Sequence, residues 1–105
     1  MAYDLVAGPG SEHGQAPDCA ASIDLHDLPA LARLRQRGDC DFLERISHLA
    51  EDQAFDLAQV DSALDSLLPL RHASLHPDER TLLLKLIDVL SFASRTQQGL
   101  YGICD

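Results

Sequence analysis

The stretch "HPDERTLLLKLIDVLSFASRTQQG", residues 76–99, has the strongest hydrophobic pattern in the chain. Nine of the twelve residues from Leu82 to Ala93 are apolar. At the spacing of an α-helix, most of them fill one arc of about 160°. The residues in this arc are Leu82, Leu83, Leu86, Ile87, Val89, Leu90 and Ala93. Such a wide arc predicts a helix at the centre of a bundle, in contact with several neighbours.

The ends of this helix are also marked in the sequence. His76 and Pro77 are typical of a helix start, because proline is favoured in the first helical turn. Asp78 and Glu79 then lie near the positive end of the helix dipole. Gly99 is the expected stop.

Leu84 and Phe92 fall outside the apolar arc, on a polar side that also carries Asp88. They lie two turns apart on nearly the same side of the helix. One explanation is coverage by a terminal segment of the same chain. The other is a small apolar ridge that contacts another chain, which makes Leu84, Asp88 and Phe92 candidate partner-binding residues.

The segment before this helix predicts further helices. "DLPALARLRQRG", residues 27–38, has Asp27 as a candidate N-cap and Gly38 as a stop. "DCDFLERISHLAEDQ", residues 39–53, restarts with Asp39 or Asp41 as the cap, and its apolar residues follow a helical period.

Residues 40–68 form either two helices or one. In "FDLAQV", Asp56 and Gln59 have capping-box spacing, and Phe55 and Val60 fit a hydrophobic staple, which favours a new helix here. No Gly or Pro separates the two parts, and the apolar period continues without a break, which is typical of a single helix. We favour the break, with the second helix ending at Pro69.

The two ends of the chain have a different composition. Residues 7–22 collect Gly, Pro, Ser and small residues, which is typical of a flexible arm after the short segment "YDLV". The tail "LYGICD" has strand-like composition and either packs on the helices or pairs with "YDLV". The predicted fold class is all-α: a small bundle of about four helices over residues 23–105, with a flexible N-terminal arm over residues 1–22.

Composition excludes several classes of function. A chain of 105 residues is long enough for one domain. Its net charge of −9 repels nucleic-acid phosphates and anionic lipids, so we expect neither nucleic acid nor membrane as a partner. The three cysteines have no CxxC spacing, and the sequence has no signal-peptide pattern and no apolar run long enough to span a bilayer. We therefore expect a cytoplasmic protein.

Catalytic and metal-binding patterns are weak. His72 and His76 stand four residues apart, as two metal ligands on one helix would, but Pro77 places the helix start after His76. We find no nucleophile elbow, phosphate-binding loop or dinucleotide-binding loop. We therefore expect no metal, no cofactor and no enzymatic activity.

The acidic residues are concentrated in one part of the sequence. Between residues 39 and 65 the chain carries eight acids and one base, Arg45. Glu44, Glu51 and Asp52 lie opposite the predicted apolar stripe, and Asp61 and Asp65 lie one turn apart on the next helix. This face is either an ordinary solvated surface or a docking patch for a basic protein.

The leading functional hypothesis is a non-enzymatic acidic protein-binding domain. Its most concrete form is an immunity protein or antitoxin that masks a basic partner. The alternative is a homodimeric regulatory or adaptor domain that uses the ridge on the last helix. An enzyme or metal protein without a local motif comes third. The predicted partner-binding residues are Glu44, Glu51, Asp52, Asp61, Asp65, Leu84, Asp88 and Phe92.

Overall fold

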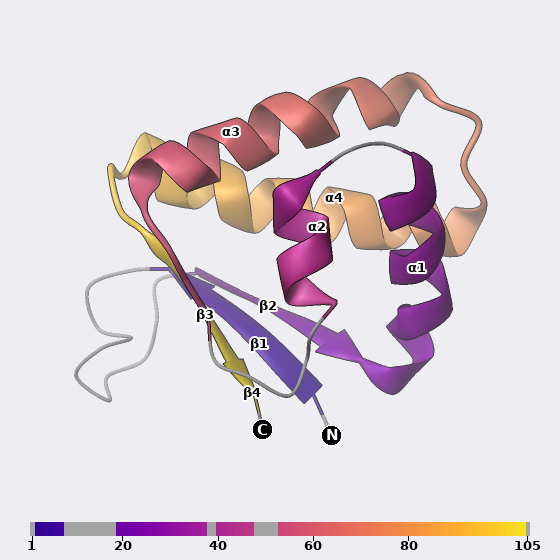
Figure 1. Cartoon of the computed structure of the whole chain (residues 1–105), viewed down its shortest axis with the longest axis horizontal. Helices are drawn as coiled ribbons and strands as arrows, with labels where there is room; N and C mark the ends of the chain where they lie inside the picture. Colours follow the sequence, from indigo (N-terminus) through magenta and orange to yellow (C-terminus); the bar gives the residue numbers. More distant parts are fainter. Residues whose placement is uncertain (1, 8–18, 38–39, 48–52, 105) are drawn as a thin grey trace.

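The computed structural model describes residues 2–7, 19–37, 40–47 and 53–104 (Figure 1). Its strands are β1 (Ala2–Ala7), β2 (Cys19–Asp24), β3 (Gln53–Phe55) and β4 (Leu100–Cys104). Its α-helices are α1 (Leu28–Arg37), α2 (Asp41–Ile46), α3 (Leu57–Leu67) and α4 (Pro77–Arg95), with 3-10 helices η2 (Leu25–Asp27) and η3 (Leu68–His72). The fold is therefore α+β, and the predicted all-α helical bundle is wrong.

The sheet joins the two ends of the described chain. Its four strands are antiparallel and follow the order β2-β1-β4-β3, so β1 and β4 are the inner strands. Tyr3 pairs with Cys104 and Val6 with Tyr101, which confirms the suggested pairing of "YDLV" with "LYGICD". Parts of the expected N-terminal arm thus belong to the sheet, in β1 and β2. Residues 8–18 of that arm lie outside the described residues.

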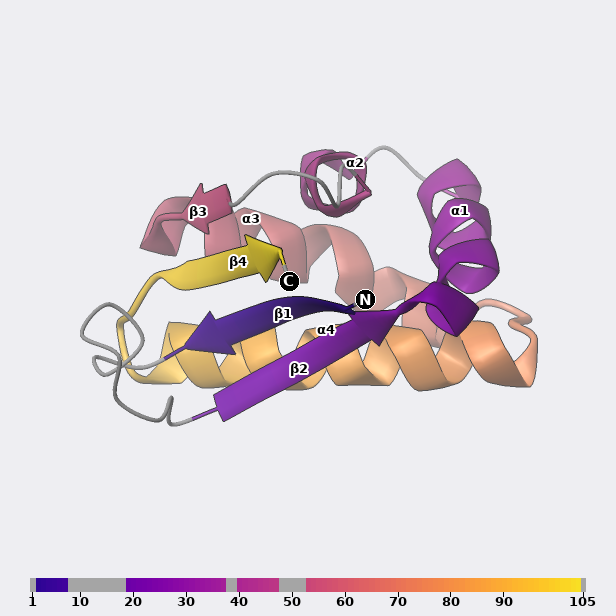
Figure 2. The ribbon, with the colours of Figure 1, turned by 90° about the horizontal axis from the view of Figure 1, so that it is seen from below.

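All four helices lie on one face of this sheet (Figure 2). Side chains alternate between the two faces of a strand, and Tyr3, Leu5 and Ala7 of β1 are buried toward the helices. Asp4 lies on the opposite face, where its carboxylate accepts a 2.8 Å hydrogen bond from the Ser22 hydroxyl. Val6, Tyr101 and Ile103 share this face with Asp4, so the sheet has one face packed against the helices and one of mixed polar and apolar character.

Helix α4 lies at the centre of the core. It contacts α1, α3, β1 and β2, which explains why its apolar arc is so wide. All the residues predicted in this arc are buried, which confirms the prediction of a central helix. The expected core residues Leu31, Ile46, Val60 and Leu67 are also buried, Leu64 is half-buried, and Leu49 lies outside the described residues.

Residues 40–68 contain two helices, and a strand lies between them. Helix α2 ends at Ile46 and α3 begins at Leu57, which confirms the predicted break. The Asp56 carboxylate accepts a 2.8 Å hydrogen bond from the Gln59 backbone N–H, and the Gln59 side chain accepts one of 2.9 Å from the Asp56 N–H. The predicted capping box is therefore confirmed.

Three other predicted helix ends are wrong. Cys40, and not Asp41, is the N-cap of α2. Asp27 is the last residue of η2, and its side chain accepts a 3.1 Å hydrogen bond from the Asp24 N–H. Helix α4 ends at Arg95, because Gln97 adopts a positive φ of 57° and closes the helix by hydrogen bonds from Gln97 and Gln98 back to the last turn.

Both edges of the sheet carry a cation from a helix. Lys85 of α4 donates a 2.9 Å hydrogen bond to the carbonyl oxygen of Ser22 on β2. Arg45 of α2 donates a 3.3 Å hydrogen bond to the carbonyl oxygen of Ala54 on β3. Charged side chains at an edge strand hinder pairing with a strand of another molecule.

Candidate functional site

The buried carboxylate of Glu79 forms ion pairs with two arginines of α1. Glu79, in the first turn of α4, is fully buried. Its Oε2 lies 2.7 Å from Nε of Arg37, and its Oε1 lies 3.3 Å from Nε of Arg33. The hydrogen bond from Arg37 lowers the pKa of Glu79 to about 2, against the opposing effect of burial. Arg33 also pairs with Asp78, so both arginines attach α1 to the start of α4.

Two other basic side chains, Lys85 and Arg35, also pair with acids of the same protein. Lys85 lies 3.6 Å from the Asp27 carboxylate. Arg35 lies 3.7 Å from the Glu44 carboxylate and donates a 3.0 Å hydrogen bond to the Ser47 hydroxyl. These contacts pair basic side chains with acids of the same protein, including Glu44 of α2.

The exposed acids gather on α2 and α3. Asp61 and Asp65 are exposed on α3, a helix with no basic residue. Asp61 accepts a 2.6 Å hydrogen bond from the Ser94 hydroxyl. Asp41 and Glu44 are exposed on the neighbouring helix α2. We call Asp41, Glu44, Asp61 and Asp65 the acidic surface.

The other predicted site residues are not all brought to this surface. Glu51 and Asp52 lie outside the described residues. On α4, Asp88 is exposed and Leu84 is 43% exposed. Phe92 is half-buried and packs against the core, so the two apolar residues of the predicted ridge differ in their surroundings.

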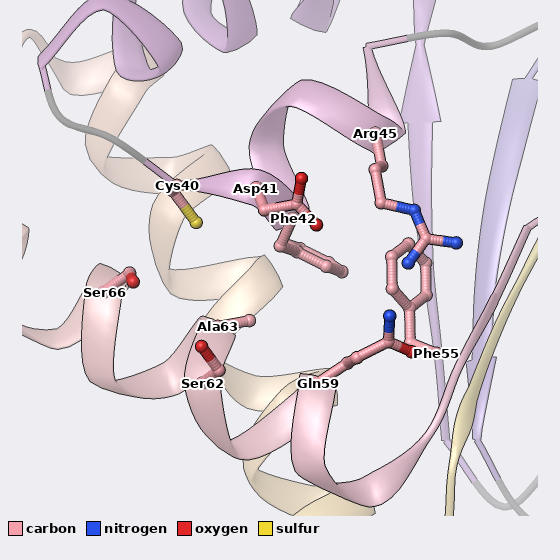
Figure 3. A pocket seen from close by; sticks show the side chains of 9 residues that line it. All are labelled: Cys40, Asp41, Phe42, Arg45, Phe55, Gln59, Ser62, Ala63 and Ser66. Carbon is pink, nitrogen blue, oxygen red and sulfur yellow. The ribbon is translucent and has the colours of Figure 1, made fainter.

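A pocket lies between α2 and α3, with Asp41 of the acidic surface on its rim (Figure 3). Its empty volume is about 330 Å³, and this figure includes space open to solvent. The base of the pocket comes from the buried side chains of Cys40, Phe42, Phe55 and Ala63. Its rim is polar and consists of Asp41, Arg45, Gln59, Ser62 and Ser66.

Aromatic contacts organise one end of this pocket. The rings of Phe42 and Phe55 meet edge to face, with centroids 5.0 Å apart. The Arg45 guanidinium lies over the Phe55 ring, 4.4 Å from its centroid. Figure 3 shows this stack at the end of the pocket opposite Cys40 and Ser66. The pocket was not predicted from the sequence, because Phe55 reaches it from a strand. The local signal for it was Phe42 and Arg45, three residues apart on one predicted helix.

Three side chains of metal-ligand type meet elsewhere, at η2: Asp24, His26 and Asp27. The two ring nitrogens of His26 face different carboxylates, with Nδ1 4.0 Å from Asp24 and Nε2 3.5 Å from Asp27. Asp27 also faces Lys85 and caps the Asp24 N–H. Ordinary ion pairs and capping therefore account for this group. His72 and His76 are both exposed, and His76 is the N-cap of α4.

Comparisons with protein-family models, with curated proteins and with solved structures found no match to this chain. Among the described helices, none combines the length and apolarity needed to cross a bilayer.

Proposed function

We propose that the protein is a non-enzymatic binding domain of the cytoplasm whose acidic surface docks and masks a basic protein, as an immunity protein or antitoxin would. The observation that carries the proposal is the separation of charge. Arg33, Arg37 and Lys85 bind acids of α4 and η2, whereas α3 presents Asp61 and Asp65 without a base on the same helix.

A rigid acidic surface suits this role. Negative charge gathered on two packed helices raises the rate of encounter with a positive partner and disfavours acidic competitors. Masking a cationic active site requires contact area and complementary charge, and no chemistry by the inhibitor. The sheet edges support docking through side chains rather than through an added strand, because Lys85 and Arg45 bind edge carbonyls of β2 and β3.

The test compares two variants of equal charge. Asp61→Asn with Asp65→Asn neutralises α3, whereas Asp4→Asn with Asp88→Asn removes the same charge from other parts of the surface. Each variant and the wild type is immobilised and exposed to extract from the source cells. We expect a basic protein that the wild type and the control retain and the α3 variant loses.

The same experiment can overturn the proposal. Equal retention of the basic protein by the wild type and both variants would show that binding does not depend on Asp61 and Asp65. Retention of acidic proteins alone would contradict charge complementarity. Circular dichroism of each variant establishes that it is folded before the comparison is made.

A further inference from the structure

We propose that the pocket between α2 and α3 receives an arginine side chain of the basic partner. This inference rests on the proposed function and names the residue type that the acidic surface selects. The pocket combines an apolar base with a polar rim that carries one exposed carboxylate, Asp41, and two hydroxyls. An arginine side chain has the matching chemistry, with an apolar stem and a planar cation of five N–H donors.

The base of the pocket suits the stem of such a side chain. Phe42, Ala63 and Cys40 are buried there, and they present apolar surface toward the opening. The protein itself already places a guanidinium on this aromatic pair, since Arg45 lies over Phe55. A second guanidinium at the Phe42 end would pack in the same way.

The rim offers acceptors for the cationic end. Asp41, Ser62 and Ser66 are exposed, and no hydrogen bond or ion pair engages their side chains within the described part of the chain. A carboxylate accepts two parallel N–H bonds from one guanidinium, and serine hydroxyls accept further ones. Figure 3 shows Ser62 and Ser66 on the side of the pocket away from the Arg45 stack, with Asp41 between them and Arg45. A guanidinium bound between Asp41 and the serines would therefore have the Asp41 carboxylate between it and Arg45.

The charged groups of the rim are Asp41 and Arg45. Arg45 donates to the Ala54 carbonyl and stacks on Phe55. The Asp41 carboxylate is exposed and is therefore the charged group of the rim that is open to an incoming cation.

The probes for the test are N-acetyl-L-arginine amide and N-acetyl-L-citrulline amide, which have nearly the same shape and differ in charge. Binding is followed by amide chemical shifts of the ¹⁵N-labelled protein. Asp41→Asn removes the charge at the rim, and Ser66→Phe blocks the pocket without changing any charge. Asp4→Asn, on the far face of the sheet, is the matched control for Asp41→Asn.

We expect the arginine probe to shift the amides of Phe42, Ala63 and Ser66, and the citrulline probe to bind about tenfold more weakly. Asp41→Asn should weaken arginine binding by a similar factor, Ser66→Phe should abolish the shifts at Phe42 and Ala63, and Asp4→Asn should have no effect.

Equal binding of citrulline, or arginine shifts that persist in Ser66→Phe, would overturn the arginine pocket. The proposed function is tested separately with the basic partner. A partner that binds Ser66→Phe as tightly as wild type, but not Asp61→Asn with Asp65→Asn, would refute the pocket and leave the acidic surface as its docking site.

Discussion

Nε of Arg37 lies 2.7 Å from Oε2 of Glu79, a carboxylate with no exposed surface that is 42 residues later in the chain. The other oxygen of Glu79 accepts a 3.4 Å hydrogen bond from the His76 N–H at the start of α4. One side chain therefore caps the central helix and attaches it to α1. The placement of α1 against the start of α4 thus depends on a charge that no hydrophobic pattern reveals.

Glu79→Gln should destabilise the fold. The amide retains a hydrogen-bond acceptor but leaves Arg33 and Arg37 without their shared counter-charge. We expect the melting temperature to fall by about 5 °C or more. Asp88→Asn, an exposed position on the same helix, is the control and should change it little. Equal effects of the two variants in thermal unfolding would contradict this account.

Stability should also fall in acid because of Glu79. Its pKa is about 2 in the folded protein, below the ordinary value of 4.5, so the unfolded chain takes up this proton first. The contribution of Glu79 to the free energy of unfolding is therefore complete above pH about 4.5 and is lost as the pH falls toward about 2. Urea unfolding over this range should show a shallower decline for Glu79→Gln than for wild type. If the stabilities of wild type and Glu79→Gln fell in parallel with pH, the low pKa of Glu79 in the folded protein would be refuted.

Gly102 of β4 is required because the Tyr3 ring of β1 lies where a Cβ would be. Gly102→Ala should cost about 1–3 kcal/mol by overpacking. In a Tyr3→Leu background the ring is gone, and the same substitution should become neutral or stabilising, because glycine weakens a strand. The free energy of unfolding of all four proteins measures this coupling, and additive effects would disprove it.

Gln97→Gly should stabilise the protein. Gln97 has a φ of 57°, which costs a side-chain-bearing residue energy that glycine avoids. We expect a gain of about 0.5–1 kcal/mol in the free energy of unfolding. Gln98→Gly is the control, because no positive φ is found at that position. A loss of stability in Gln97→Gly would show that the left-handed residue carries no strain.

Local signals in the sequence predicted local structure. His76 with Pro77 and Asp56 with Gln59 marked two helix starts, because capping depends on residues within one turn. The apolar arc of α4 predicted its central place, because apolar residues that repeat with the helical period mark the side of the helix that is buried.

The sheet could not be predicted in the same way. Strand β2 contains Ala20, Ala21 and Ser22, which have low strand propensity and resemble a linker. Strand β3 covers three residues, within a run whose apolar spacing also fits a helix. The pairing of β1 with β4 joins opposite ends of the chain, so no local period reports it; the strand-like composition of "LYGICD" indicated it only as one of two alternatives. The pocket depends on the pairing of β3 with β4, since Phe55 is held beside Leu100 in the sheet.

The most direct test of the central claim is the association rate of the basic partner with the protein, measured by stopped flow from about 20 to 500 mM NaCl. If the acidic surface guides docking, the wild-type rate should fall steeply with salt, and Asp61→Asn with Asp65→Asn should lower the rate at low salt by about tenfold and flatten its salt dependence. Asp4→Asn with Asp88→Asn, which changes the net charge equally, should behave nearly as wild type. Identical rates and salt dependence for the two variants would contradict the claim that α2 and α3 form the docking surface.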